Sequence, residues 1–283
     1  MSLPDDPSFA EPLGGDVPEG DAPEGDAPES DAPEGDAPED GEVAKPEGEP
    51  EEEEVPAGPD IPAPSVDELR DAMAWAFEGE EVESELLDVY AKHAHLVLDE
   101  NRRVNLTAIL DPKEVAAKHY LDCWRITQFL PLFGHTVVDI GTGGGFPAVP
   151  VALAEPMARV TAIDSTRKKT DFVQRAVDEL EIKNVAVHWG RAEDFLQTER
   201  ADFAVFRAVS SVRENVRTLR KVKQSVRDVV MLKGKSWSRE VRAAEREAER
   251  LGFRLDTVWE HSLPGEMGEH VILVYQAPGS LGR

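Results

Sequence analysis

The sequence predicts an α/β fold in which a seven-stranded, mostly parallel sheet has helices on both faces and is preceded by a helical extension. Two observations support this prediction. From Gly134 onward, short apolar runs rich in β-branched residues alternate with stretches of helical periodicity, the pattern of a doubly wound parallel sheet. Near the C-terminus two strand-like runs follow one another with no helix between them. Such a pair predicts a hairpin, and therefore an antiparallel strand, at one edge of the sheet.

Each predicted strand is a short apolar run bounded by polar or turn-forming residues. The seven runs are Thr136–Ile140, Arg159–Ile163, Val185–His188, Asp202–Phe206, Asp228–Leu232, Phe253–Trp259 and His270–Gln276. Helices are expected between them near 146–154, 166–180, 192–197 and 213–224, and a long charged helix near 238–251. The sheet domain is therefore assigned to residues 134–283.

Residues 65–133 are expected to form a separate N-terminal helical region. Residues 65–68 read Ser-Val-Asp-Glu, a capping-box pattern, and apolar residues recur at helical spacing over 82–99. A third helix is expected from Pro112, a favourable first-turn residue, to about Leu130. His93 and His95 flank the apolar face of the second helix, and we expect ordinary surface or core-edge histidines there.

Residues 1–64 are predicted to be a disordered acidic tail rich in Pro and Gly. The chain has a net charge of −26, and residues 1–60 hold 22 of its 57 acidic residues but only one base, Lys45. Five tandem pentapeptides of the GDAPE type fill 15–39, and such a composition cannot supply a core. The remainder is nearly balanced, so the overall charge does not exclude a nucleic-acid partner. A solvating tail is favoured over an electrostatic tether or an autoinhibitory mimic of nucleic acid.

The chain has a single cysteine, Cys123, so it forms no internal disulfide and no Cys-based metal site. The N-terminal residues lack the basic and apolar regions of a signal peptide, and no apolar run is long enough for a membrane span. We therefore expect a soluble, cytoplasmic protein, monomeric, with neither a metal nor a membrane partner.

The segment that carries the chemistry combines a strand, a Gly-rich turn and a helix start: Val137-Val138-Asp139-Ile140-Gly141-Thr142-Gly143-Gly144-Gly145-Phe146-Pro147. Glycines permit positive φ and a close approach of the backbone to a ligand. A dinucleotide fingerprint would need glycine at position 146, which is Phe. S-adenosylmethionine carries an ammonium and a sulfonium and no phosphate, and Asp139 favours such a cation. A turn with purely structural glycines is the alternative interpretation.

The second strand is followed by Asp164, 25 residues after Asp139. A carboxylate at this position can accept both hydroxyls of a ribose, and a role as helix N-cap is compatible with that. The third strand is followed by Gly190-Arg191-Ala192-Glu193-Asp194, where backbone and side chains meet an adenine edge if the ribose lies on Asp164.

These features together resemble the RsmG (GidB) family of 16S rRNA guanine-N7 methyltransferases over about residues 100–276. The resemblance rests on Asn105-Leu106-Thr107-Ala108-Ile109, Lys118-His119-Tyr120-Leu121-Asp122, the motif from Asp139 to Pro147, Asp164-Ser165 with Lys168, Arg191-Ala192-Glu193, Arg207-Ala208 and Leu232-Lys233-Gly234. It implies a Rossmann-like class I methyltransferase fold, S-adenosyl-L-methionine as the cofactor, and ribosomal RNA or the small ribosomal subunit as the partner.

The resemblance also implies which residues form the site. The cofactor would be held by Asp139, Gly141, Gly143, Gly145, Phe146, Asp164, Ser165, Ala192, Glu193 and Arg207. Asn105 and Arg207 are the expected catalytic residues, although Arg207 could equally be a buried structural partner. Guanine N7 has a lone pair and no proton, so neither a general base nor a metal is expected. A basic cluster at Arg213, Arg217, Arg220, Lys221, Lys223 and Arg227 is expected to contact RNA phosphates.

Several positions depart from the family pattern. Ala148 stands where the family usually has Gly, Phe206 where it has a small residue, and Glu269 where it often has Arg before a histidine. Val209-Ser210-Ser211 replaces a common Ala-containing run. A methyltransferase with another substrate therefore stays open, as does a noncatalytic RsmG-like binding protein, although the intact Gly motif argues against the latter. Phe146 disfavours a dehydrogenase.

Overall fold

The computed structural model describes residues 57–278, so only positions 57–64 of the predicted acidic tail are described. The bounds of the helices that precede the sheet are α1 (Val66–Ala76), α2 (Ser84–Glu100), α3 (Pro112–Val115) and α4 (Asp122–Phe129). Two of them start at the residues that the sequence predicts. The Ser65 hydroxyl accepts from the Glu68 N–H at 3.2 Å, and the Asp111 carboxylate accepts from the Glu114 N–H at 3.0 Å. These caps satisfy donors that a helix start leaves without a partner.

A π-helical turn, η1 (Ala116–Leu121), lies between α3 and α4. The single helix predicted from Pro112 to about Leu130 is therefore wrong in its middle turn. The Asp122 N–H bonds to the Ala117 carbonyl, five residues back. Turns of this width disturb the regular ladder of hydrogen bonds and are frequent at functional sites.

All seven predicted strands are present and form one sheet in the order β3-β2-β1-β4-β5-β7-β6. Their bounds are β1 (Thr136–Ile140), β2 (Arg159–Asp164), β3 (Val185–Trp189), β4 (Ala201–Arg207), β5 (Val226–Lys233), β6 (Arg254–Leu263) and β7 (Gly268–Gln276). Strands β1 to β5 are parallel, whereas β7 is antiparallel to both β5 and β6. This confirms the mostly parallel sheet with a closing hairpin.

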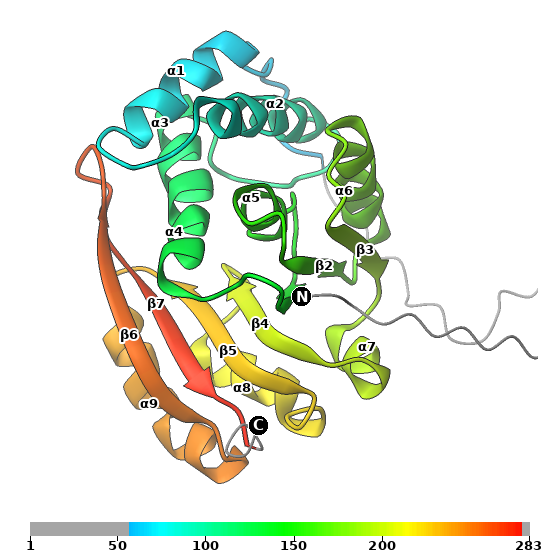
Figure 1. The fold of residues 1–283 in the computed structure, drawn as a ribbon, viewed down its shortest axis with the longest axis vertical. Helices are drawn as coiled ribbons and strands as arrows, with labels where there is room; N and C mark the ends of the chain where they lie inside the picture. The colour runs from blue at the N-terminus through cyan, green and yellow to red at the C-terminus, as the bar shows by residue number, and fades with distance from the viewer. Residues whose placement is uncertain (1–56, 279–283) are drawn as a thin grey trace, which may run out of the picture. The chain divides into compact units, whose positions relative to one another are not determined.

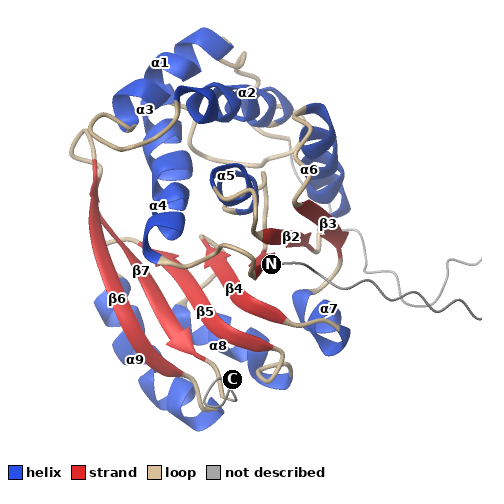
Figure 2. Cartoon of the chain, in the orientation of Figure 1, coloured by secondary structure: helices blue, strands red, loops and turns tan. Residues whose placement is uncertain are grey.

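Helices cover both faces of the sheet (Figures 1 and 2). On one face α5 (Ala148–Ala154) and α6 (Arg167–Glu179) pack together with the N-terminal helices, and on the other lie α7 (Ala192–Thr198), α8 (Val212–Thr218) and α9 (Trp237–Leu251). Strand β1 illustrates the arrangement, because Val137 belongs to the first core and Val138 to the second. Successive residues of a strand point to opposite faces, so a sheet covered on both faces needs apolar residues at both.

The helix expected over 213–224 ends earlier than predicted. Helix α8 stops at Thr218, and a 3-10 turn, η2 (Leu219–Lys221), follows it. Ser211 and Glu214 form a capping box at the start of α8, in which the side chain of each accepts from the backbone N–H of the other. None of the helices within residues 57–278 is both long and apolar enough to cross a membrane.

Buried polar contacts join the N-terminal helices to one another and to the sheet-covering helix α5. Tyr90 of α2 is fully buried and donates its hydroxyl hydrogen to the carbonyl oxygen of Pro150 in α5 at 2.7 Å. His93 is also fully buried, with Nδ1 2.8 Å from the Tyr120 hydroxyl. The expectation of a surface or core-edge histidine is therefore wrong for His93, because the face of α2 that carries it packs against Phe146. It holds for His95, which is half-buried.

We expect Tyr90→Phe to lower the free energy of unfolding by about 1–2 kcal/mol, because the Pro150 carbonyl loses its buried donor. Tyr275→Phe is the matched control: Tyr275 is also a buried residue, but its hydroxyl has no hydrogen bond to the described residues. Urea denaturation of the full chain measures both effects. Equal loss in the two variants would contradict the proposed role of the Tyr90 bond.

Candidate functional site

The Gly-rich turn after β1 is tied to the neighbouring strand β2 by backbone hydrogen bonds. The N–H groups of Gly141 and Thr142 both donate to the carbonyl of Ile163 in β2, each at 2.9 Å. Gly141, Gly143 and Gly145 have φ of +78°, +56° and +91°, a region that side chains rarely adopt. A Cβ added to Gly141 would lie 2.8 Å from a methyl carbon of Val209. The backbone conformation therefore favours glycine at position 141, and any side chain there would also have to displace Val209.

Asp139 lies beneath this turn and is completely buried. Its Oδ2 accepts from the Thr142 hydroxyl at 2.6 Å and from the Ala148 N–H at 3.0 Å. Its Oδ1 is buried without a hydrogen-bond partner among the described residues. Burial raises the pKa of Asp139 to about 7, against the opposing effect of these hydrogen bonds. A cation placed next to Oδ1 would favour the ionised form.

Asp164 holds the same turn from the neighbouring strand. Its Oδ2 accepts from the Gly143 N–H at 3.0 Å, and its Oδ1 accepts from the Thr166 N–H at 2.9 Å. Ionised carboxylate oxygens each have a second acceptor position, so Asp164 keeps capacity for further donors. The carboxylate also borders a cavity of about 160 Å³ at the carboxyl ends of the strands.

The structure brings together part of the predicted cofactor set around this cavity. Gly141, Asp164, Ser165, Ala192 and Glu193 line it. The cavity wall does not include the other predicted members: Asp139, Gly143, Gly145, Phe146 and Arg207. Gly190 and Arg191, which follow β3, also contribute to the wall. The predicted site therefore divides into a cavity wall and a layer of residues that supports it.

Phe146 belongs to the supporting layer. It is buried, and its ring stacks on His119 with centroids 4.7 Å apart and meets Tyr120 edge-on at 5.3 Å. His93 completes the cluster. The side chain that follows the glycines therefore anchors the turn in the core shared with the N-terminal helices.

Arg207, at the end of β4, points into the same layer. It donates to the carbonyl of Lys118 at 2.8 Å and to Nδ1 of His119, and its guanidinium lies 5.7 Å from the centre of the Phe146 ring. Because a guanidinium only donates, Nδ1 of His119 must be the acceptor, which leaves Nε2–H to donate to the Thr107 hydroxyl at 2.8 Å. Burial and the neighbouring Arg207 charge lower the pKa of His119.

Asn105 lies apart from this network. It is exposed in the loop after α2, and its side chain has no hydrogen bond to any residue that the structure describes. The next residue, Leu106, packs on the Gly turn, since its Cβ lies 3.5 Å from where a Cβ on Gly144 would be. The Asn105 loop therefore borders the turn from the side of the N-terminal helices.

Several cavity residues are missing from the predicted set, namely Ile140, Ile163, Phe206, Val209 and Thr218. The two isoleucines are strand ends next to predicted residues, so strand pairing identifies them. Val209 and Thr218 have no local sequence signal. Val209 reaches the cavity because the loop after β4 turns back over Gly141 through Ala208, which has φ of +55°. Thr218 reaches it from the last position of α8.

The chemistry of these residues fits S-adenosylmethionine. The buried Oδ1 of Asp139 and the carboxylates of Asp164 and Glu193 suit a ligand with a cationic amino-acid part and ribose hydroxyls. Apolar walls from Ile163, Ala192 and Phe206 suit an adenine ring. Binding at the carboxyl edge of a parallel sheet is the general rule for this architecture.

The strand order, the Gly turn held between two acidic strand ends, and the cavity beside them define a Rossmann-like class I methyltransferase that uses S-adenosylmethionine.

Comparison with known proteins gives the family. The family model described as rRNA small subunit methyltransferase G (GidB) matches residues 86–265, more than half of the chain. Proteins named ribosomal RNA small subunit methyltransferase G are similar to it. The one from Carboxydothermus hydrogenoformans is 33% identical over 70% of this chain and 86% of its own length, and the one from Solibacter usitatus is 35% identical over 65% and 87%. The chain belongs to the rRNA small subunit methyltransferase G family.

Among solved structures, a S-adenosylmethionine-dependent methyltransferase from Aquifex aeolicus is 19% identical, with a TM-score of 0.45 over 59% of this chain and 94% of that one.

Asp139→Asn should change how stability depends on pH. The folded-state pKa of about 7 lies above that of an unfolded Asp, so ionisation destabilises the wild-type fold as pH rises from about 4 to 7. The neutral amide does not ionise. We expect the wild type to lose stability relative to the variant by roughly 1 kcal/mol per pH unit in that window, with a constant difference above it. Urea denaturation between pH 5 and 8 measures this, and parallel pH profiles would contradict it.

Proposed function

We propose that the chain transfers the methyl group of S-adenosylmethionine to N7 of a guanine in 16S ribosomal RNA. One observation carries the proposal: in a chain of this family, the Gly turn is held between Asp139 and Asp164 at the mouth of a cavity with carboxylate and apolar walls. We further propose that the protein acts in the cytoplasm as a monomer without a metal.

Each part of the site is assigned a role in holding the cofactor. The Asp164 carboxylate accepts from the ribose hydroxyls while it keeps its two backbone donors. The amino-acid part lies along Gly141, Gly143 and Gly145, where Asp139 supplies negative charge through its buried Oδ1. Ser165, Ala192 and Glu193 border the adenosine part. Phe146 acts indirectly, by fixing the turn in the core.

The reaction requires little of the protein beyond positioning. When bound, S-adenosylmethionine would supply a methyl group on a cationic sulfur, released as the sulfur–methyl bond breaks, and guanine N7 has a lone pair and no proton to remove. The chain therefore needs no general base. Its task is to align the base with the methyl group, which is where most of the rate enhancement would arise.

Asn105 is proposed to position the guanine, and Arg207 is proposed to position the layer of residues that supports the cavity wall. The exposed amide of Asn105 is free to hydrogen-bond a base edge from the loop that packs on the turn. Arg207 holds the carbonyl of Lys118 and the ring of His119, so it fixes the helical region relative to the end of β4. Its role is therefore positioning rather than contact with the reacting atoms.

A second candidate is methyl transfer to a different substrate. Phe206 favours it, because this large side chain lines the cavity where family members usually have a small residue. A bulkier wall at the end of β4 changes the shape of the cavity and, through the cofactor that it holds, the place where a substrate meets the methyl group.

Labelled S-adenosylmethionine and undermethylated small-subunit RNA or subunits separate these candidates. We expect incorporation of label, with N7-methylguanine identified by mass spectrometry. Binding of S-adenosylmethionine without incorporation would contradict the RNA assignment and favour the second candidate or a noncatalytic protein, in which case Phe206 and Glu269 are the first positions to revert.

Gly141→Ala should weaken binding of S-adenosylmethionine at least tenfold, because a Cβ there clashes with Val209 and strains the turn. Gly134→Ala is the control, since Gly134 has a similar φ of +74°, no atoms within 4 Å of an added Cβ, and a place before β1 at the opposite edge of the sheet. Each variant should lose roughly 1 kcal/mol of stability from the positive φ, with a further loss in Gly141→Ala from the contact with Val209. Only Gly141→Ala should lose affinity by calorimetry. Unchanged affinity in Gly141→Ala would contradict the proposal that the Gly turn binds S-adenosylmethionine.

A further inference from the structure

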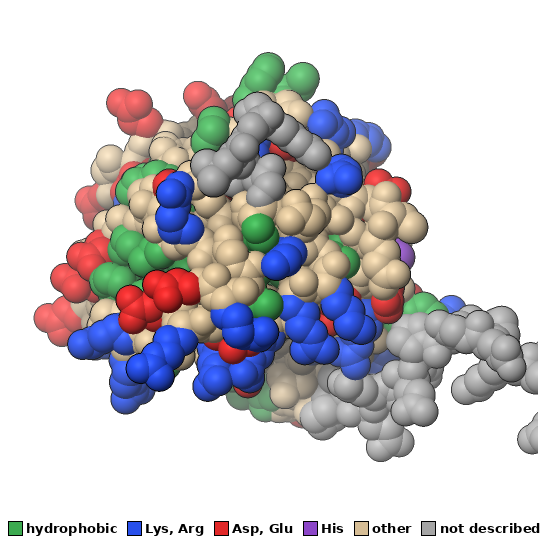
Figure 3. All heavy atoms as spheres, turned by 90° about the horizontal axis from the view of Figure 1, so that it is seen from below, with side chains coloured by type: hydrophobic (Ala, Val, Ile, Leu, Met, Phe, Trp, Pro, Cys, Tyr) green, Lys and Arg blue, Asp and Glu red, His purple; other side chains and the backbone are tan. Residues whose placement is uncertain are grey.

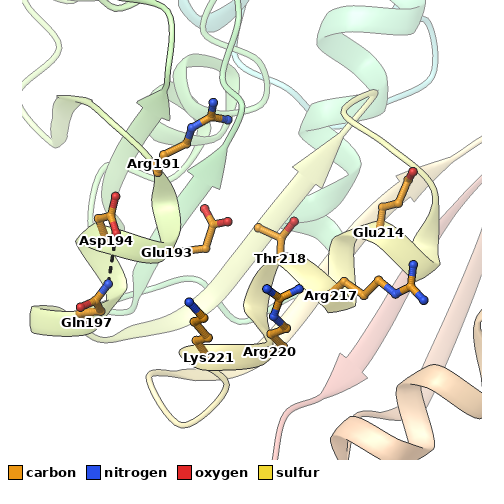
Figure 4. A pocket seen from close by; sticks show the side chains of 9 residues that line it. All are labelled: Arg191, Glu193, Asp194, Gln197, Glu214, Arg217, Thr218, Arg220 and Lys221. Carbon is orange, nitrogen blue, oxygen red and sulfur yellow. Dashed lines mark hydrogen bonds between the residues drawn. The ribbon is translucent and has the colours of Figure 1, made fainter. Parts of the chain in front are cut away.

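A second and larger hollow adjoins the cofactor cavity. It has a volume of about 510 Å³ and lies between α7 on one side and α8 with η2 on the other (Figure 4). Arg191, Glu193 and Thr218 line both spaces. We call this hollow the α7–α8 groove. Because the two spaces share a wall, a strand lying in the groove passes directly beside the cofactor cavity.

The wall formed by η2 is cationic. Arg220 and Lys221 line the groove, are exposed, and form no ion pair or hydrogen bond through their side chains with the residues between 57 and 278. Arg217 differs, because it pairs with Glu247 of α9 at 3.0 Å. In Figure 4 the Arg220 and Lys221 side chains lie on the side of the groove that faces α7, whereas Arg217 extends away from α7. Two cations are therefore available to a ligand.

The wall formed by α7 has the opposite character. Glu193 and Asp194 supply carboxylate oxygens, and Gln197 donates to Asp194 at 3.1 Å. A uniform polyanion would meet repulsion along this wall. A suitable ligand carries negative charge along one edge and hydrogen-bond donors along the other.

Single-stranded RNA has this chemistry, since phosphates lie along its backbone and ribose hydroxyls and base amino groups are donors. We propose that the α7–α8 groove binds the backbone of the RNA strand that flanks the target nucleotide, with phosphates on Arg220 and Lys221 and donors on the α7 carboxylates. The proposal rests on the proposed function and extends it, because it assigns a binding track outside the cofactor cavity. Figure 3 shows Lys and Arg side chains gathered in a band with acidic ones interspersed on the face that it presents.

The first test is the double variant Arg220→Gln/Lys221→Gln in the full chain. We expect KM for small-subunit RNA to rise on the order of tenfold at moderate salt, with kcat and the Kd for S-adenosylmethionine unchanged. Loss of two phosphate contacts should reduce the slope of log affinity against log salt by roughly 1.4. Fluorescence anisotropy of a labelled single-stranded RNA measures the same slope without catalysis.

The control removes two charges elsewhere. Arg239 and Arg246 of α9 are exposed, line neither space, and have no side-chain ion pair to the described residues. Arg239→Gln/Arg246→Gln should leave KM and the salt slope near the wild-type values. Equal effects of the two double variants would contradict RNA binding in the α7–α8 groove and would show that basic residues attract RNA wherever they lie on the surface.

The second test concerns the α7 wall. Asp194 borders the groove but not the cofactor cavity. In competition binding, unlabelled RNA should displace the labelled RNA better than DNA of equivalent sequence, and Asp194→Ala should reduce that preference. If Asp194→Ala bound RNA more tightly and kept the same preference for RNA over DNA, the carboxylate would only repel phosphate. That result would contradict the proposal that the α7 carboxylates accept hydrogen bonds from the RNA.

The experiments distinguish an error in the proposed RNA-binding groove from an error in the proposed methyl transfer. A wild-type protein that binds S-adenosylmethionine and RNA but transfers no methyl group contradicts the proposed function. A wild-type protein that methylates small-subunit RNA, with the Arg220→Gln/Lys221→Gln variant matching it in KM and salt slope, contradicts the groove alone.

Discussion

Two carboxylates on adjacent parallel strands hold the Gly turn in place by hydrogen bonds, and the rest of the site depends on these bonds. Asp139 binds the middle and the far end of the turn through Thr142 and Ala148, and Asp164 binds it through Gly143. The strands are in register, with Ile140 beside Ile163, so both acids arrive at one edge of the sheet. The turn can then present backbone to a ligand, and α5 can begin directly after it.

Holding the turn in this way buries the charge of Asp139. Asp139 is buried with one oxygen unpartnered, and its pKa of about 7 shows that the fold disfavours its charge. A cationic ligand relieves that penalty, whereas an anionic one would increase it. The same arrangement therefore favours a cofactor with a positively charged amino-acid part.

The N-terminal helices stabilise the turn from behind. Phe146 is packed among His93, His119 and Tyr120, and Arg207 joins this cluster to the end of β4. The π-helical turn places Lys118 so that its carbonyl accepts from Arg207. The helical region is thus part of the site's support, and the α7–α8 groove lies on the opposite face of the sheet, against the second core.

Sequence patterns predict the strands, the turn and Asp164 because each depends on local signals: β-branched runs, glycines and a polar residue at a strand end. They do not predict His93 as a core residue, since its burial depends on which helix face meets Phe146. The π turn and the inward direction of Arg207 depend on partners that are distant in the chain. Val209 enters the cavity wall through the path of the loop after β4, and Thr218 enters it from the end of α8. Long-range packing decides all of these.

A crystal structure of the full chain with bound S-adenosylhomocysteine tests the central claim most directly. The two-carboxylate arrangement predicts ribose hydroxyls within hydrogen-bonding distance of Asp164 and the amino-acid part along Gly141 and Gly143. A ligand bound elsewhere, with Asp164 making only its two backbone contacts, would contradict it.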